Sequence, residues 1–229
     1  PVTTPLMFEH RLARSARQDR KRIVLPEGDD DRILRAADQL LRRSVCDLTI
    51  LGSPETITDR AKSMGLDISA ATLIHPEHSD LRDEMAHLLC DLRGHKGMSM
   101  DIAHDAVTDV TIFGTLLVKA GLADGMVSGA AHTTADTVRP ALQLIRTTPE
   151  SSVVSSVFFM CLADKVLVYG DCAVNPDPDP EQLADIAISS AVTAKAFGID
   201  PYVAMLSYST GASGAGGDVE KVRKATDIV

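Results

Sequence analysis

Short apolar runs alternate with amphipathic helical patterns along the first half of the chain, and this alternation restricts the fold more than any other feature. The apolar runs lie at 22–26, 48–52, 72–74 and 125–128. Helical spacing of apolar residues follows the first three, and Ser53-Pro54 supplies a helix N-cap and a first helical position. Strands that alternate with helices predict a doubly wound α/β fold with a mostly parallel sheet.

The pattern changes in the last third of the chain. Two β-rich runs at 153–161 and 166–169 predict an antiparallel hairpin. A broadly apolar helix is expected at 181–197, followed by a strand at 203–206. Because that helix is apolar around most of its circumference, it is expected to be buried, in a core or against a second subunit.

This change in pattern predicts two domains after a short linker. We expect residues 1–7 to form a linker from an upstream region, since they begin P-V-T-T-P and lack a signal-like apolar stretch. Residues 8–148 are predicted to form a first α/β domain. Residues 149–229 are predicted to form a second, partial α/β domain.

Charge and composition narrow the classes of function. The net charge of −9 argues against nucleic acid as a partner, because phosphate backbones are held by clustered Lys and Arg. No apolar run is long enough to cross a membrane. The four cysteines form no C-x-x-C pair, which favours a reducing cytoplasm and argues against a zinc site. An anionic ligand of this acidic chain therefore needs a locally basic pocket.

Three loops at predicted carboxyl ends of strands could bind a ligand, at 27–32, 128–139 and 207–217. The second combines small residues, hydroxyls, a His and an Arg, so that backbone N–H groups and side chains could bind an oxyanion. An equally weighted alternative is a capped helix start, with Thr133 and Asp136 as a capping box or Pro140 in the first turn. The third loop lacks the Lys of a P-loop and the dinucleotide glycine pattern.

Two further arginines stand in unusual positions. Arg93 ends a predicted helix, where a basic residue ordinarily complements the helix dipole, so a binding role requires its side chain to turn inward. Arg32 lies in a helix first turn, where positive charge is unfavourable. It either pairs with the neighbouring Asp residues or is retained for a ligand.

Four sequence runs resemble the phosphate acetyltransferase (phosphotransacetylase) family. They are R-G-H-K-G at 93–97, D-G-M-V-S-G-A-A-H at 124–132, D-T-V-R-P-A at 136–141 and A-M-L-S-Y-S-T at 204–210. The resemblance is collinear from about Phe8 to the last residue. It implies an isocitrate dehydrogenase-like α/β fold of two domains with a cleft between them, usually as a homodimer. It also implies reversible acetyl transfer between CoA and inorganic phosphate.

The resemblance also implies roles for individual residues. By motif, the residues that would line the cleft or lie near the phosphate and acyl groups are Arg32, Arg93, Ser128, His132, Thr133, Arg139 and Ser209. No tightly bound cofactor and no metal is implied, and acetyl-CoA, CoA, phosphate and acetyl phosphate are expected as substrates. The family's catalytic Ser, Arg and Asp segment is expected beyond Val229, so the first domain would lack its closing segment. This chain alone would then be inactive.

Three other functions remain open. A phosphate butyryltransferase would share the fold and differ in its acyl pocket. A non-catalytic module that binds acetyl-CoA, of the kind fused to some malic enzymes, would bind without turnover. A dehydrogenase of the related fold is disfavoured, because the sequence shows no convincing metal-carboxylate cluster or nicotinamide signature.

Overall fold

The computed structural model describes residues 3–149, 151–210 and 213–229. It divides into two compact units, one formed by residues 13–146 and the other by residues 3–12 together with residues from 147 onward. Residues 1, 2, 150, 211 and 212, which the predicted linker, second domain and third loop include, lie outside the described residues.

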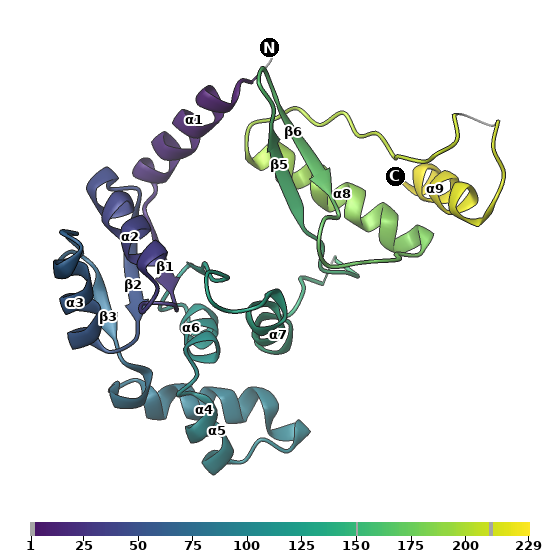
Figure 1. Cartoon of the computed structure of the whole chain (residues 1–229). Helices are drawn as coiled ribbons and strands as arrows, with labels where there is room; N and C mark the ends of the chain where they lie inside the picture. Colours follow the sequence, from purple (N-terminus) through teal and green to yellow (C-terminus); the bar gives the residue numbers. More distant parts are fainter. Residues whose placement is uncertain (1–2, 150, 211–212) are drawn as a thin grey trace. The chain divides into compact units, whose positions relative to one another are not determined.

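The first unit is built on a four-stranded parallel sheet with strand order β3-β2-β1-β4 (Figure 1). Its strands are β1 (Lys21–Leu25), β2 (Cys46–Leu51), β3 (Thr72–Ile74) and β4 (Gly125–Met126). The central strand is β1, in which Ile23 pairs with Leu48 of β2 on one side and with Gly125 of β4 on the other. The predicted α/β fold with a parallel sheet is confirmed.

Helices cover both faces of this sheet (Figure 1). They are α2 (Asp31–Arg43), α3 (Pro54–Ser63), α4 (Arg82–Arg93), α5 (Met100–Ala106), α6 (Val110–Lys119) and α7 (Thr134–Leu144). Successive strand residues point to opposite faces, so Val24 and Leu25 enter two separate apolar cores. Val24 packs with Met85 of α4 and Phe113 of α6, whereas Leu25 packs with Leu34 of α2. Helices α2 and α3 contribute to the core on one face of the sheet, and α4, α5, α6 and α7 contribute to the core on the other face.

The second unit contains an antiparallel hairpin and two helices. The hairpin pairs β5 (Val157–Cys161) with β6 (Val166–Gly170), and the helices are α8 (Pro180–Ala196) and α9 (Gly217–Ile228). The predicted hairpin and the predicted long helix are confirmed. The predicted strand at 203–206 is wrong, since these residues form no strand and Leu206 is 83% exposed. An apolar run becomes a strand only where another strand pairs with it.

The start of the chain packs within the second unit. Helix α1 (Pro5–Gln18) carries Phe8, whose ring centroid lies 5.1 Å from that of Phe159, and Val166 donates its N–H to the carbonyl of Thr3. Residues 3–12 therefore belong with the second unit, whereas the sequence pattern predicted a linker at residues 1–7 and a first domain from residue 8. The aromatic contact of Phe8 accounts for the difference. Among the described helices, none has the length and apolar character that a membrane crossing requires.

Candidate functional site

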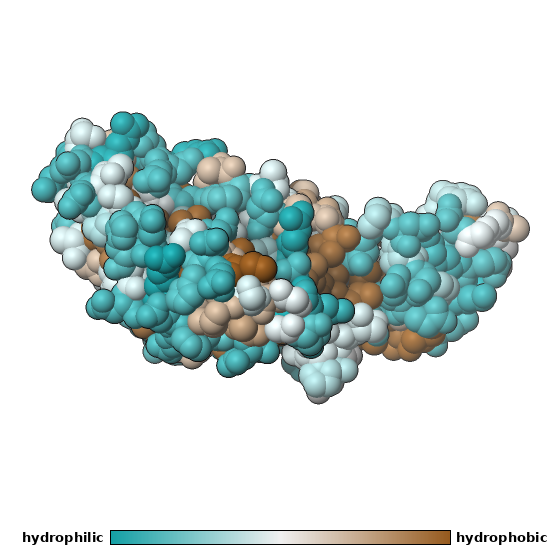
Figure 2. Space-filling model, turned by 90° about the horizontal axis from the view of Figure 1, so that it is seen from below, coloured by the Kyte–Doolittle hydropathy of each residue, from teal (hydrophilic) through white to brown (hydrophobic). Residues whose placement is uncertain are grey.

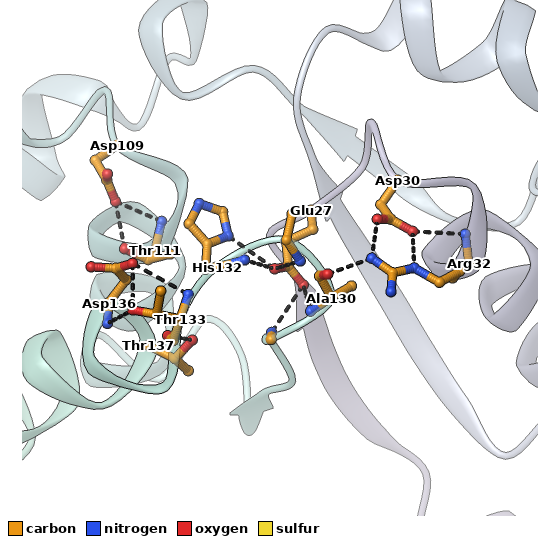
Figure 3. A network of polar contacts seen from close by, with 12 residues as sticks. Glu27, Asp30, Arg32, Asp109, Thr111, Ala130, His132, Thr133, Asp136 and Thr137 are labelled. Atoms are coloured by element: carbon orange, nitrogen blue, oxygen red, sulfur yellow. Dashed lines mark hydrogen bonds and ion pairs between the residues drawn. The ribbon is translucent and has the colours of Figure 1, made fainter.

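The loop that follows β4 is wrapped around a carboxylate of the chain itself, that of Glu27 (Figure 3). One oxygen, Oε2, accepts the backbone N–H groups of Gly129 at 3.0 Å and Ala130 at 2.9 Å. The other, Oε1, accepts those of Ala131 at 2.7 Å and His132 at 2.8 Å. Four consecutive N–H groups that converge on one anion form a backbone nest. The sequence left an oxyanion site at this loop as one of two alternatives, and the structure shows a carboxylate from the 27–32 loop bound there.

Parallel pairing of β1 with β4 brings these two loops together. Val24 pairs with Met126, and the N–H of Val127 donates to the carbonyl of Val24 at 3.0 Å. The carboxyl ends of both strands therefore lie at one edge of the sheet. This edge also lies at the point where the strand order reverses, which is the usual ligand position in open α/β sheets.

Glu27 is ionised in this environment. Its side chain is 1% exposed, and burial by itself would raise the pKa. The N–H groups of His132, Ala131 and Ala130 and the His132 side chain outweigh that effect and lower the pKa of Glu27 to about 2. His132 Nδ1 lies 2.9 Å from Oε1. The N–H groups of the loop therefore bind a fixed negative charge at neutral pH.

Arg32 contacts the same loop through a backbone carbonyl group. Its guanidinium donates to Asp30 through Nε at 3.0 Å and Nη2 at 2.6 Å, and it also donates to the carbonyl of Ala130. Asp30 is the N-cap of α2 and accepts the N–H of Arg32 at 2.8 Å, and the hydrogen bonds from Arg32 lower its pKa to about 2. Of the two alternatives for Arg32, pairing with a neighbouring Asp is observed. The side chain remains 70% exposed, so it can still meet a ligand.

Helix α7 begins with the predicted capping box. Thr133 Oγ1 accepts the N–H of Asp136 at 3.2 Å and donates to its Oδ2 at 2.6 Å, while the N–H of Thr133 donates to the same carboxylate. The alternative start with Pro140 in the first turn is wrong, because Pro140 lies inside α7. The Thr133 hydroxyl, predicted to lie near substrate, is therefore engaged in capping. The anion-binding loop and the helix cap lie in the same short segment. The two alternatives for this segment, a binding loop and a capped helix start, are therefore compatible.

The remaining predicted site residues differ in their surroundings. Ser128 Oγ is buried and has no hydrogen-bond partner among the described residues. Arg139 is exposed on α7 and Arg93 ends α4, and neither guanidinium donates a hydrogen bond to another described residue. Ser209 belongs to the second unit, where its Oγ is likewise buried without a partner in the described part of the chain. The structure thus joins the Arg32 and His132 segments directly, through the 128–132 loop.

Sequence reasoning missed Glu27, although a signal was present. Glu27 follows the apolar run at 22–26, and a charged residue that becomes buried needs compensating partners. Its partners lie about a hundred residues away in the chain. No local pattern connects them.

A separate cavity of about 500 Å³ opens at the carboxyl ends of β1, β2 and β3. It is lined by Gly28, Asp29, Gly52, Ser53, Thr56, Arg60, His75, Pro76, Thr108 and Val110. None of the predicted site residues is among these lining residues. Arg60 is held at its wall by Asp31, with N–O distances of 2.7 and 2.8 Å.

One group of described side chains has the composition of a metal site, namely His75, Glu77 and His78. Their potential ligand atoms lie within 4.8 Å of one another. The two imidazole rings are stacked, however, with centroids 4.5 Å and planes 22° apart.

Comparison with known proteins places the chain in one family. The model of the family described as phosphate acetyl/butaryl transferase matches residues 7–229. Phosphate acetyltransferases of Nitratidesulfovibrio vulgaris and a Synechocystis strain are 56% and 55% identical to the chain, each over 98% of its length. The chain spans about a third of the length of these curated relatives, at 32% and 33%.

Solved structures agree with this result. A phosphotransacetylase from Streptococcus pyogenes superposes with a TM-score of 0.93 at 42% identity, over 98% of this chain and 69% of that one. The fold and the sequence comparisons lead to the same conclusion. The chain belongs to the phosphate acetyl/butaryl transferase family.

Proposed function

We propose that the protein carrying this chain is a phosphate acetyltransferase, which interconverts acetyl-CoA and phosphate with acetyl phosphate and CoA. The observation that carries the proposal is the assembly of Glu27, Arg32 and the 128–132 loop at the ligand edge of the sheet. Family membership and the names of the relatives support it. A CoA thioester and phosphate are both anionic, and an acidic chain needs locally placed cations such as Arg32 to bind them.

The proposed chemistry is a direct acyl transfer. When acetyl phosphate is consumed, the CoA sulfur attacks the acetyl carbonyl, the bond between that carbon and the phosphate oxygen breaks, and phosphate departs. The thiol proton passes to a base, which is useful because a free thiol with a pKa of roughly 8.5 is mostly protonated at neutral pH. Arginines would stabilise the charge that develops on the departing phosphate.

The residues proposed to bind substrate are those named from the family motifs. The guanidinium groups of Arg139 and Arg93 donate no hydrogen bond to another described residue and Arg32 is largely exposed, which supports a role in binding phosphate or the acyl phosphate. The orphaned hydroxyl of Ser128 and the free Nε2 of His132 would contribute polar contacts. Thr133 would have to exchange its capping bond with Asp136 to do the same.

Further parts of the proposal concern cofactors, assembly and location. We propose acetyl-CoA as a substrate, with no tightly bound cofactor, and a homodimer that works in the cytoplasm without nucleic acid or membrane partners. Figure 2 shows brown, hydrophobic areas on the face that it displays. Exposed apolar residues of the second unit include Ile188 and Val192, which lie one turn apart on α8 and support a subunit contact there.

The test is phosphate-dependent release of free CoA thiol from acetyl-CoA by the full-length protein. We expect release with phosphate and none without it, and faster release from acetyl-CoA than from butyryl-CoA. Absence of phosphate-dependent release, with acetyl-CoA still bound, would identify a binding module. Preference for butyryl-CoA would identify a butyryltransferase.

A further inference from the structure

We propose that Glu27 is a positioning residue for the proposed reaction, which fixes the 129–132 loop and presents Nε2 of His132 to the bound substrate. This inference rests on the proposed function and assigns a task to a residue that the family motifs did not single out. Glu27 acts through His132 and touches no substrate itself. Its side chain is 1% exposed.

The first support is the number of contacts from one carboxylate to one short segment. Glu27 accepts five hydrogen bonds from residues 129–132, four from backbone N–H groups and one from the His132 side chain (Figure 3). Arg32 holds the carbonyl of Ala130. Glu27 lies in the loop after β1 and Arg32 lies in the first turn of α2. Together they fix the 129–132 loop through its N–H groups and through one carbonyl group.

The second support concerns which groups remain for a ligand. The N–H groups of residues 129–132 are all bonded to Glu27, and a phosphate could use them only by displacing a buried carboxylate. Charge repulsion makes it costly to add a second anion to the same nest. The structure therefore assigns substrate binding at this edge to side chains that project from the loop and from α7.

The third support is the tautomer of His132. An ionised carboxylate only accepts hydrogen bonds, so Nδ1 of His132 carries the proton in the 2.9 Å contact with Glu27. In the neutral form of the ring, this proton position leaves the lone pair on Nε2, which makes no hydrogen bond to another described residue. The His132 side chain is 30% exposed. Glu27 thus orients an imidazole whose second nitrogen is open to a ligand.

Glu27→Gln in the full-length protein tests this inference. The amide retains the shape, but its NH₂ group faces N–H donors of the loop, so hydrogen bonds are lost and the tautomer is no longer enforced. We expect kcat/KM to fall roughly 10- to 100-fold, as when a partner that orients a functional His is removed. The ¹⁵N NMR signals of His132 should change from the form protonated at Nδ1 in the wild type to a mixture of tautomers.

A matched control is Asp38→Asn. Asp38 is also a buried carboxylate of the first unit, and it accepts hydrogen bonds from Arg42 and from the N–H of Asp67, away from the loop. Its substitution should lower the melting temperature while kcat/KM and the His132 signals stay as in the wild type. If Glu27 had only a structural role, Glu27→Gln would likewise lower the melting temperature and leave kcat/KM and the His132 signals as in the wild type.

Several results would overturn the inference. One is wild-type kcat/KM and an unchanged His132 tautomer in a folded Glu27→Gln protein. If that variant does not fold, His132→Gln replaces it, and unchanged kcat/KM in His132→Gln would equally count against the proposal. A wild-type His132 without a proton on Nδ1 overturns it as well. Absence of phosphate-dependent CoA release from the wild type would contradict the proposed function. The NMR measurement would still show whether Glu27 sets the tautomer of His132.

Discussion

Asp124 binds Arg22 through three hydrogen bonds, one from the backbone N–H at 2.8 Å, one from Nε at 3.1 Å and one from Nη2 at 2.8 Å. The pair fixes the start of β4 against β1, because Asp124 directly precedes β4 and Arg22 lies within β1. The hydrogen bonds from Arg22 lower the pKa of Asp124 to about 2. This contact supports the strand pairing on which the position of the 128–132 loop depends.

We therefore predict that Asp124→Ala lowers the melting temperature and increases amide hydrogen exchange at Gly125 and Met126. The short strand β4 has only two residues and depends on such anchoring. Asp19→Ala is the control, since Asp19 forms an exposed ion pair with Lys21 and such pairs contribute little. Equal melting temperatures for the two variants would contradict the prediction.

Acid should remove the stability that Glu27 provides. Its folded pKa of about 2 lies below the ordinary value of 4.5, so its contribution is complete above pH 4.5 and is lost as the pH falls toward 2. The shift corresponds to about 3 kcal/mol in the free energy of unfolding. Urea denaturation of the wild type and Glu27→Gln should therefore differ most near neutral pH. A difference that stays constant down to pH 3 would argue against this role.

Gly28→Ala should destabilise the first unit. A Cβ at this position would lie 2.5 Å from the carbonyl oxygen of Leu51 and 2.6 Å from Cδ1 of Ile57. Forcing an atom into packed surroundings costs ~1–3 kcal/mol. Gly94→Ala is the matched control, since a Cβ added there would meet no atom within 4 Å and the backbone of Gly94 is right-handed helical. Chemical denaturation of both variants measures the contrast, and equal stabilities would refute it.

Arg139→Gln should reduce activity and leave the fold intact. The side chain is exposed and donates no hydrogen bond to a described residue, so the free energy of unfolding should change by less than about 0.5 kcal/mol. Loss of a charge-assisted hydrogen bond to phosphate should lower kcat/KM roughly 10- to 100-fold. Wild-type kinetics in this variant would remove Arg139 from the proposed site.

Val192→Asp should weaken the proposed homodimer. Val192 and Ile188 form an exposed apolar strip on α8, whereas Ile186 and Ala187 of the same helix are buried. A charge placed in a subunit contact is costly to desolvate. Light scattering of the full-length protein should show a shift from dimer to monomer. A dimer of unchanged stability would exclude this strip from the contact.

Local signals in the sequence predicted most of the fold of the first unit. The apolar run around Val24 and the Ser53-Pro54 helix start are signals that span a few residues, and both correspond to elements of the structure. The capping box of Thr133 and Asp136 is equally local and is present. Such features depend on neighbours in the chain, which a sequence displays directly.

Features that depend on distant partners could not be predicted in this way. The run at 203–206 has the composition of a strand and forms none, and its Leu206 is exposed. Glu27 acquires its role only through the N–H groups of Gly129 to His132. Composition indicated that the loop could bind an anion, but it could not indicate that a side chain of the chain would occupy it.

The pairing of Ile23 with Gly125 also has a consequence for how the first unit assembles. Strands β1, β2 and β3 follow one another along the chain, whereas β4 joins β1 only after α4, α5 and α6 have been added. Closing so long a stretch of chain is entropically slow. During synthesis the Glu27 carboxylate is therefore added about a hundred residues before its N–H partners, so the proposed site can form only after His132 has been added.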